Sequence, residues 1–251
     1  MKEKKSKNIQ KQDNTTQIND MFSMIAHQWR QPLAAISSNA STLDLKLLLD
    51  DYDKETFTVL VKDILAYSQH LSLTINEFRN FFKDSKVTNE TTFKSIIDEC
   101  VKIINISLRD KDIEITVQNN FKDKLHIYES EFKQVVLNLL RNAEDVILEN
   151  EISKGKIEIK TYADGTNAIF EVKDNGGGIS KDIIKNIFDP YFSTKSKKNG
   201  TGLGLYMSKV IIETHCLGSI KCLNSKDGAV FRITLNPNHP SLISESSGLP
   251  I

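Results

Sequence analysis

The sequence lacks an excess of charge of either sign, because 33 lysines and arginines balance 33 aspartates and glutamates. Binding to nucleic acid usually requires a clear basic surface, so we expect no nucleic-acid partner. The sequence also lacks a run of about 20 apolar residues, the length that a membrane-spanning helix needs. Its N-terminus has no apolar segment of signal-peptide type either. We therefore expect no membrane insertion from this chain.

Cysteine is scarce and unpatterned. Cys100, Cys216 and Cys222 are odd in number and show no spacing typical of a metal or redox site. Such cysteines are typical of reduced, incidental thiols, which favours a cytoplasmic location. The 251 residues suffice for one large domain or two modest ones, and the 39% hydrophobic content is ordinary for a soluble globular protein.

Two long amphipathic segments follow a polar stretch over residues 1–13 that we expect to be disordered. In the first segment, over residues 18–49, apolar residues recur every three or four positions. Asp53 is a suitable N-cap for a second helix that extends to about residue 82. The predicted inner faces contain Phe22, Ile25, Trp29, Leu33, Ile36, Ala40, Leu43 and Leu47 in the first helix, and Phe57, Leu60, Ile64, Leu71, Ile75 and Phe78 in the second.

A hairpin of two such helices cannot bury both apolar stripes by itself. Pairing with a second copy into a four-helix bundle would bury them, and packing on the rest of the same chain is the alternative. We expect a homodimer, because each helix has about eight turns and is longer than a small domain needs. Residues 14–84 are therefore interpreted as a helical-hairpin dimerisation domain.

Residues 90–236 change to a mixed pattern of helices and strands. Helices are predicted over 93–107, 131–148 and 203–214, and strands over 113–117, 156–162, 168–173, 219–223 and 229–235. Because the two element types do not alternate strictly, we expect an α+β sandwich, a mixed sheet with helices on one face. The polar tail over 237–251 is expected to be disordered.

Two glycine-rich motifs lie in this second region. Asp174 follows a predicted strand and begins Asp-Asn-Gly-Gly-Gly-Ile. Its carboxylate can accept a hydrogen bond from an exocyclic amine, and Gly176 and Gly178 let the backbone approach a flat ring, although a plain turn is the alternative. The second motif opens a helix whose N–H groups suit phosphate oxygens, without Walker or Rossmann spacing. Its candidate residues are Gly200, Thr201, Gly202, Leu203 and Gly204.

Two further elements accompany these motifs. Asn138 and Asn142 lie four residues apart on one helix face, and the side-chain oxygen of Asn142 suits magnesium (Mg2+). A buried, structural asparagine is the alternative for either residue. Between the glycine motifs, Phe188 and Phe192 could anchor a mobile lid whose Lys195 reaches a phosphate; core contacts of a surface loop are the alternative.

The order and spacing of these four elements over residues 90–236 resemble the GHKL-type ATP-binding domain shared by sensor histidine kinases, type II topoisomerases, Hsp90 and MutL. The resemblance implies that Asp174 binds the adenine amine of ATP and that Asn142 binds magnesium. It also implies that Gly176 and Gly178 line the base. Lid and phosphate site are then shaped by Gly200, Gly202 and Gly204.

A histidine in the first predicted helix supplies a candidate phosphoryl acceptor. His27 precedes Pro32 by five residues, and a proline inside a helix bends it locally, which can help expose a side chain. His-Gln-Trp-Arg-Gln-Pro-Leu over 27–33 resembles the phosphoacceptor box of a bacterial subgroup of histidine kinases, as residues 74–83 resemble the end of its second helix. This implies autophosphorylation of His27 from ATP and transfer to an aspartate on the receiver domain of a response regulator.

Three positions depart from the usual family pattern. Gln28 replaces the carboxylate that accepts the histidine proton in most relatives, and an amide cannot serve as a general base. Gln31 replaces an asparagine or threonine associated with dephosphorylating the partner. Asp145 stands where many relatives carry a basic residue. The catalytic candidates are therefore His27, Gln28 and Gln31, and either another group takes the proton or Gln28 orients the ring.

Other functions stay open at this point. A catalytically impaired nucleotide-binding scaffold, or a phosphatase-type regulator of the same kind of pathway, is the main alternative, because Gln28 lacks basicity. An ATPase of the topoisomerase or MutL kind is disfavoured, because Asn138 occupies the position where those enzymes have a glutamate base. No recognisable sensor precedes His27, so the chain is truncated, receives its signal from a partner, or senses through the bundle.

Overall fold

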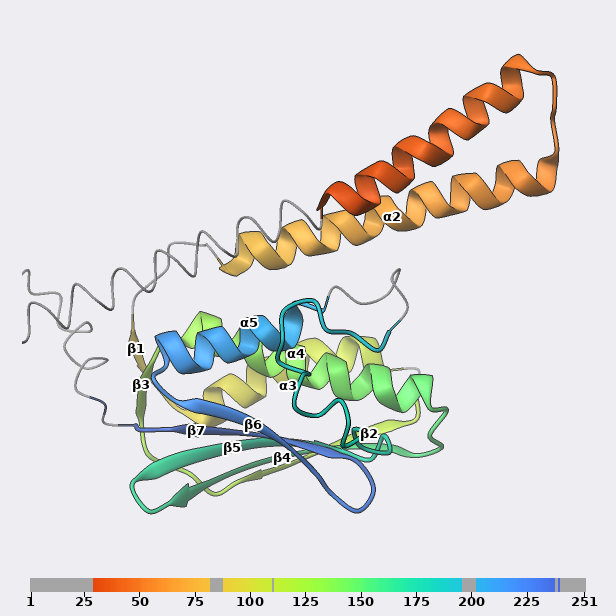
Figure 1. Cartoon of the computed structure of the whole chain (residues 1–251). Coiled ribbons are helices and arrows are strands. Elements are labelled where there is room, and N and C mark those ends of the chain that lie inside the picture. Colours follow the sequence, from red (N-terminus) through yellow and green to blue (C-terminus); the bar gives the residue numbers. More distant parts are fainter. Residues whose placement is uncertain (1–28, 82–87, 110, 196–201, 238, 240–251) are drawn as a thin grey trace, which may run out of the picture. The chain divides into compact units, whose positions relative to one another are not determined.

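The computed structural model describes residues 29–81, 88–109, 111–195, 202–237 and 239. Within these ranges the chain forms two compact units, a helical hairpin and an α/β domain (Figure 1). The tails predicted over 1–13 and 237–251 lie outside the described residues, apart from 237 and 239.

The hairpin consists of a helix described over residues 29–48 and of α2, Lys54–Phe81. The chain reverses at Asp50, whose φ is 49°. Asp53 then caps α2, because its Oδ2 accepts a hydrogen bond from the backbone N–H of Thr56 at 2.9 Å. The predicted interruption and its aspartate cap are both present.

The apolar stripes of the hairpin are only partly covered within one chain. Phe57, Leu60, Ile64 and Leu71 on α2 are half-buried, in line with their predicted inner face. By contrast, Leu33, Leu47 and Ile75 of the predicted stripes are 52%, 59% and 43% exposed, while Pro32 is buried. This incomplete cover is what the sequence predicts for a single hairpin, because two helices cover only one side of each other. Phe22 and Ile25, and the side chain of Phe78, lie outside the described part.

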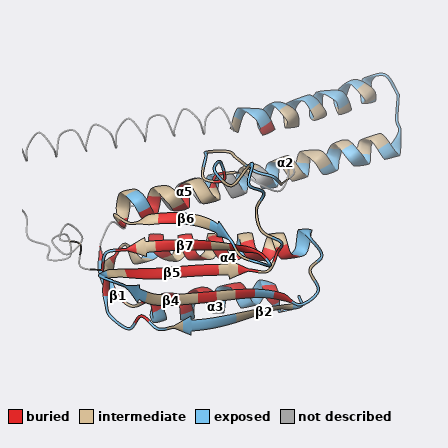
Figure 2. Ribbon diagram, turned by 60° about the horizontal axis from the view of Figure 1, so that its bottom comes forward, coloured by how far each residue is buried: buried red, intermediate tan, exposed pale blue. Residues whose placement is uncertain are grey.

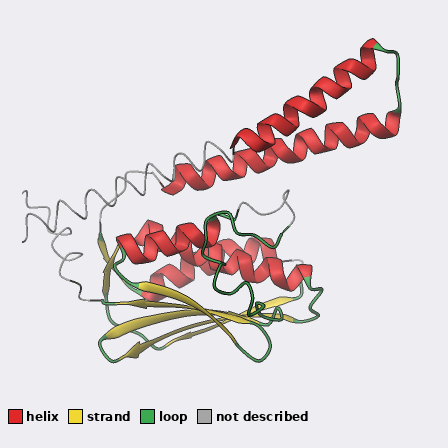
Figure 3. Ribbon diagram, in the orientation of Figure 1, coloured by secondary structure: helices red, strands yellow, loops and turns green. Residues whose placement is uncertain are grey.

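The α/β domain contains a five-stranded mixed sheet with the order β2-β4-β5-β7-β6. Its strands are yellow in Figure 3. Strand β2 runs parallel to β4, with Ile115 opposite Ile157, and the other neighbours are antiparallel. The strands are β2 (Ile113–Asn119), β4 (Gly155–Asp164), β5 (Asn167–Asp174), β6 (Ser219–Asn224) and β7 (Ala229–Leu235). A two-stranded sheet of β1 (Asn89–Thr91) and β3 (Leu125–Ile127) was not predicted, since its strands are too short to show periodicity.

Helices cover one face of the five-stranded sheet (Figure 1). They are α3 (Phe93–Leu108), α4 (Glu129–Glu149) and α5 (Gly204–Val210), and α5 continues as a π-helical turn, η1 (Ile211–His215). Thr92 caps α3 by accepting a hydrogen bond from the N–H of Ser95. The predicted α+β sandwich with helices on one face is therefore confirmed.

The core lies between these helices and the sheet (Figure 2). Along β7 every second residue is buried, as an amphipathic strand requires. The ring of Phe93, on α3, lies 5.3–5.8 Å from the rings of Phe121, Phe132 and Phe170 and joins helices to sheet. The other face carries charged rows, one of which contains Lys160, Glu171, Arg232 and Lys221. This one-sided core fixes α4 over β4 and β5, where the candidate site lies.

Candidate nucleotide-binding site

Asp174 ends β5 and is 4% exposed. Its Oδ1 accepts hydrogen bonds from the backbone N–H groups of Gly176, at 2.8 Å, and of Ala229, at 3.2 Å. Burial raises the pKa of Asp174 above its usual value, although these two hydrogen bonds act in the opposite direction. The strand end thus presents a fixed, partly desolvated carboxyl group whose Oδ2 forms neither of these bonds.

Glycines allow the backbone to pack closely around this carboxyl group. A Cβ added at Gly176 would lie 2.5 Å from Cγ1 of Val146 on α4. A Cβ added at Gly228, in the β6–β7 turn, would lie 2.0 Å from the backbone oxygen of Asp174. Gly228 was missed by the sequence reasoning, because a glycine in a hairpin turn is too common to stand out. Gly178 has a φ of 80°, a backbone conformation that residues other than glycine rarely adopt.

The two asparagines of α4 lie in different environments. Asn138 donates from Nδ2 to Oγ of Ser208, at 2.9 Å, and Ser208 in turn donates to the backbone oxygen of Gly204. Asn138 therefore joins α4 to the start of α5. Asn142 is half-buried, and its side chain makes no hydrogen bond within the part of the chain that the structure describes. Of the two, Asn142 has the amide that is available to a ligand.

The second glycine motif is described from Gly202 onward; Gly200 and Thr201 lie outside the described residues. Leu203 is 4% exposed and precedes the first turn of α5, where its backbone oxygen accepts from Met207. The backbone oxygen of Gly202 accepts from the N–H of Tyr191 at 2.9 Å. Both sides of the intervening loop therefore meet at its base.

The aromatic residues before this loop pack on the domain. The ring of Phe188 stands edge-on to Phe231 of β7, with 6.3 Å between ring centroids, which matches the core-contact alternative. Phe192 is half-buried, and Lys195 is the last residue described before 196–201. The binding roles of Phe188, Phe192 and Lys195 stay predictions.

The candidate acceptor lies at the edge of the described hairpin. His27 and Gln28 fall outside the described residues, and Gln31 is exposed on the helix. The structure thus brings together Asp174, the first glycine motif and the part of α4 that contains Val146 and Asn150.

Family models match both units of the chain. Residues 127–239 match the "histidine kinase-, DNA gyrase B-, and HSP90-like ATPase" model, and residues 17–85 match the "His Kinase A (phospho-acceptor) domain". The α/β domain is therefore of an ATP-binding type. Since the two models together match most of the chain, in the order expected for such proteins, the chain belongs to the sensor histidine kinases.

Curated relatives support this assignment. The chain is 31% identical to the sensor protein KdpD of Clostridium acetobutylicum over 86% of its own length and 24% of that protein. It is 29% identical to the histidine kinase AtoS of Escherichia coli over 88% of its length and 35% of that protein. The chain thus spans less than half the length of either of these curated relatives.

Solved structures share the fold. The catalytic domain of the histidine kinase ThkA is 28% identical, with a TM-score of 0.53, over 60% of this chain and 95% of that one. A crystal structure of ThkA in complex with the response regulator TrrA covers 87% of this chain and 61% of that one. It has a TM-score of 0.62 at 24% identity, so this similarity shows a shared fold and nothing more.

Two features are absent from the residues that the structure describes. No helix there combines the length and apolarity needed to cross a membrane. No group of three or more histidine, cysteine, aspartate or glutamate side chains there is arranged to hold a metal ion.

Proposed function

We propose that this chain is the catalytic core of a two-component sensor kinase, which phosphorylates His27 from ATP and passes the phosphoryl group to an aspartate on a receiver domain. The observation that carries the proposal is the presence of a phospho-acceptor domain containing His27 and of an ATPase domain in one chain. Because the chain spans a fraction of its relatives, the stimulus lies beyond this proposal.

In the proposed ATP site, Asp174 accepts a hydrogen bond from the adenine amine. Its Oδ1 already accepts from Gly176 and Ala229, so Oδ2 is the oxygen that remains for the base. Gly176 and Gly178 line the ring, and Gly200, Gly202 and Gly204 shape the phosphate side. This arrangement favours adenine over a base with a keto oxygen in the same position, since two acceptors would then face each other.

We assign magnesium binding to Asn142. The donor set fits a hard cation, because a half-buried amide oxygen without a hydrogen-bond partner among the described residues can join phosphate and water oxygens. Magnesium would neutralise charge that develops on the phosphates. Asn138 is committed to Ser208 through its Nδ2, so its Oδ1 alone could contribute.

In the proposed transfer, an imidazole nitrogen of His27 attacks the γ-phosphorus while the bond to the β–γ bridging oxygen breaks, and the electron pair leaves with ADP. The imidazole also loses its N–H proton. Gln28 cannot accept this proton, so another group must accept it. Gln28 and Gln31 are assigned orienting roles.

We further propose a homodimer with a four-helix bundle. Exposed apolar side chains on both hairpin helices, among them Leu33, Leu47 and Leu65, support it, because a second hairpin would cover them. ATP and receiver domains are cytosolic, so we place this part of the protein in the cytoplasm.

Incubation with γ-labelled ATP and magnesium tests the kinase proposal. Wild type is expected to acquire label that is acid-labile and alkali-stable, while His27→Gln acquires none and still binds ATP. His126→Gln, which changes a histidine of β3 in the ATPase domain, is the matched control and should label normally. ATP binding without label on wild type would favour the scaffold alternative, and normal labelling of His27→Gln would rule out this acceptor.

A further inference from the structure

Three asparagine side chains hold the backbone of the first glycine motif, and none of them belonged to the predicted site. Asn224, the last residue of β6, forms a reciprocal pair with Ile179. Its Oδ1 accepts from the N–H of Ile179 at 2.8 Å, and its Nδ2 donates to the backbone oxygen of Ile179 at 2.6 Å. This side chain pairs with the backbone as a neighbouring strand would.

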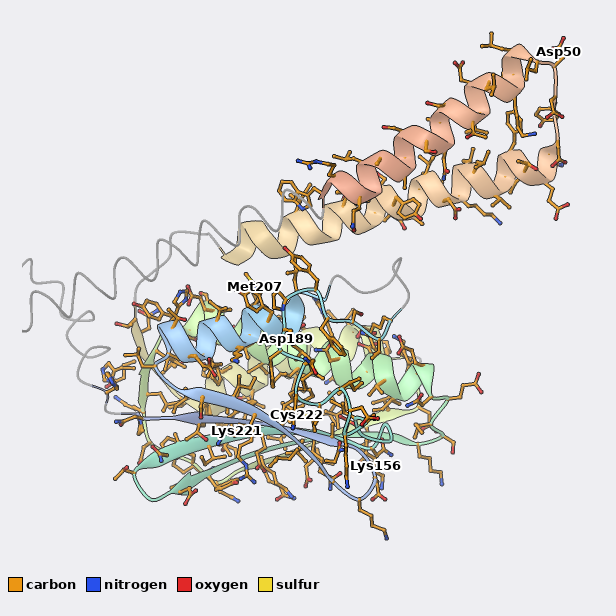
Figure 4. The ribbon with its side chains drawn as sticks, in the orientation of Figure 1. Asp50, Lys156, Asp189, Met207, Lys221 and Cys222 are labelled. Carbon is orange, nitrogen blue, oxygen red and sulfur yellow. The ribbon has the colours of Figure 1, made fainter. Side chains whose placement is uncertain are left out.

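The other ties come from different directions. Asn150 caps the C-terminus of α4 and donates from Nδ2 to the backbone oxygen of Gly176 at 2.7 Å. Asn175 accepts from the N–H of Lys156 (labelled in Figure 4), at 2.7 Å, and donates to the oxygen of Lys154. The segment Gly176–Ile179, called here the glycine segment, is therefore tied to α4 by Asn150 and to β6 by Asn224, and Asn175, the residue before it, is tied to the start of β4.

The composition of the glycine segment explains why such ties matter. Gly176, Gly177 and Gly178 are consecutive, and glycine loses more conformational freedom on ordering than any other residue. Gly177 and Gly178 have φ values of 98° and 80°, and without restraints these residues would also adopt many other backbone conformations. The N–H of Gly177 adds one backbone bond, to Asp227 at 2.9 Å. An untied segment of this composition would pay its ordering entropy when the nucleotide binds.

We propose that Asn224 and Asn150 are positioning residues of the ATP site, which hold the glycine segment in its nucleotide-binding conformation before ATP arrives. The inference rests on the proposed role of this segment in lining adenine. Neither asparagine needs to touch ATP. Their side chains lie on exposed residues at the ends of β6 and α4, so they contribute little to the core. Their removal therefore lowers ATP affinity more than it lowers fold stability.

Equilibrium ATP binding to the full chain tests this proposal, with the Tm measured without nucleotide. Loss of two hydrogen bonds in Asn224→Ala is expected to raise the Kd for ATP about tenfold, and loss of one in Asn150→Ala about threefold. The double variant should lose less than the product of the single effects, because both side chains order one segment. Gln118→Ala is the matched control, since it removes an exposed amide bonded to Glu158; its Kd should equal that of wild type.

A second nucleotide separates positioning from general destabilisation. Inosine triphosphate carries a keto oxygen where ATP has the amine that faces Asp174, so wild type should prefer ATP. In Asn224→Ala the preference for ATP should shrink, because the base is no longer held in register with Asp174. Asn224→Asp keeps the acceptor for the N–H of Ile179 but opposes two oxygens at its carbonyl, so its Kd should also rise.

The possible failures can be told apart. A wild-type chain that does not bind ATP overturns the proposed function and this inference with it. A wild type that binds, beside an Asn224→Ala chain with unchanged Kd and unchanged ATP preference, overturns the inference alone. Equal losses for both nucleotides, in step with a lowered Tm, overturn it too, since they would mark a structural role.

Discussion

The contact between Gly176 and α4 gives the sharpest test of the site geometry. A Cβ added at Gly176 would lie 2.5 Å from Cγ1 and 3.3 Å from Cγ2 of Val146, whereas ordinary contact begins at 3.4 Å. The backbone of Gly176 is not in the left-handed region, so an alanine can adopt its backbone conformation without strain. Gly176→Ala therefore perturbs the packing of the glycine segment on α4 without straining the backbone.

The size of the effect follows from this overlap. The segment or Val146 must move by about 1 Å, and overpacking of this kind costs about 1–3 kcal/mol. Because Asp174 receives a hydrogen bond from the N–H of Gly176, the displacement reaches the carboxyl group directly. If the cost is borne in the nucleotide-binding conformation, ATP affinity falls about 5- to 150-fold.

Equilibrium binding of ATP to four full-length proteins measures this effect: wild type, Gly176→Ala, Val146→Ala and the double variant. Val146→Ala removes both methyl groups that the new Cβ would meet, so the double variant should recover to within about threefold of wild type. Gly178→Ala is the contrast, because the φ of Gly178 is 80° and a neighbouring substitution cannot relieve that strain.

Two results would refute the reasoning. Wild-type affinity in Gly176→Ala would mean that the segment does not pack on Val146 as the structure has it. A large loss that Val146→Ala does not reverse would mean that the new methyl group acts on the Asp174 carboxyl group, whose Oδ1 lies 3.2 Å from the added Cβ, or on the nucleotide itself.

Three further outcomes are expected. Since burial raises the pKa of Asp174 above 3.8, the fold disfavours its carboxylate; at pH 7 Asp174→Asn should melt no lower than wild type while losing ATP affinity, and any gain in Tm should vanish as the pH falls through the raised pKa. Lys111→Met should cost about 1–3 kcal/mol of unfolding free energy, measured in urea, because the buried Glu144 loses the ammonium 2.5 Å away and keeps the hydrogen bond from Ser107; Glu144→Gln should cost less. Burial raises the pKa values of Cys100 and Cys222 to about 12, so iodoacetamide at pH 8 should modify both thiols slowly until denaturant is added, as mass spectrometry would record.

The fold was predictable where periodicity extends over several residues. The strand predicted over 229–235 has the bounds of β7, and the helix predicted over 131–148 differs from α4 by two residues at one end and one at the other. The three-residue strands β1 and β3 escaped, because three residues cannot display an alternation. The π-helical turn η1 was read as ordinary helix, because a single turn of five residues is too short to show a period of its own.

The hairpin shows a different limit. Periodicity correctly separated apolar from polar faces, yet Leu33 and Leu47 lie exposed in the single chain while Pro32 is buried. A pattern of apolar residues says which side chains avoid water and does not say whether the same chain or a second copy covers them. The sequence therefore predicts burial more readily than it predicts the partner.

The candidate site divides along a similar line. Asp174, Gly176 and Asn142 could be proposed in advance because the roles assigned to them are directed at a ligand, and a ligand's chemistry constrains residue type and spacing together. Asn150 and Asn224 act on the backbone of the glycine segment, from 26 and 45 residues away in the chain. Asparagine is also common at helix ends, strand ends and turns, so only the folded structure shows that these two asparagines bind the glycine segment. Residues that position a site therefore leave no recognisable motif. Their partner is the backbone, which every sequence shares, so no ligand restricts their type or spacing.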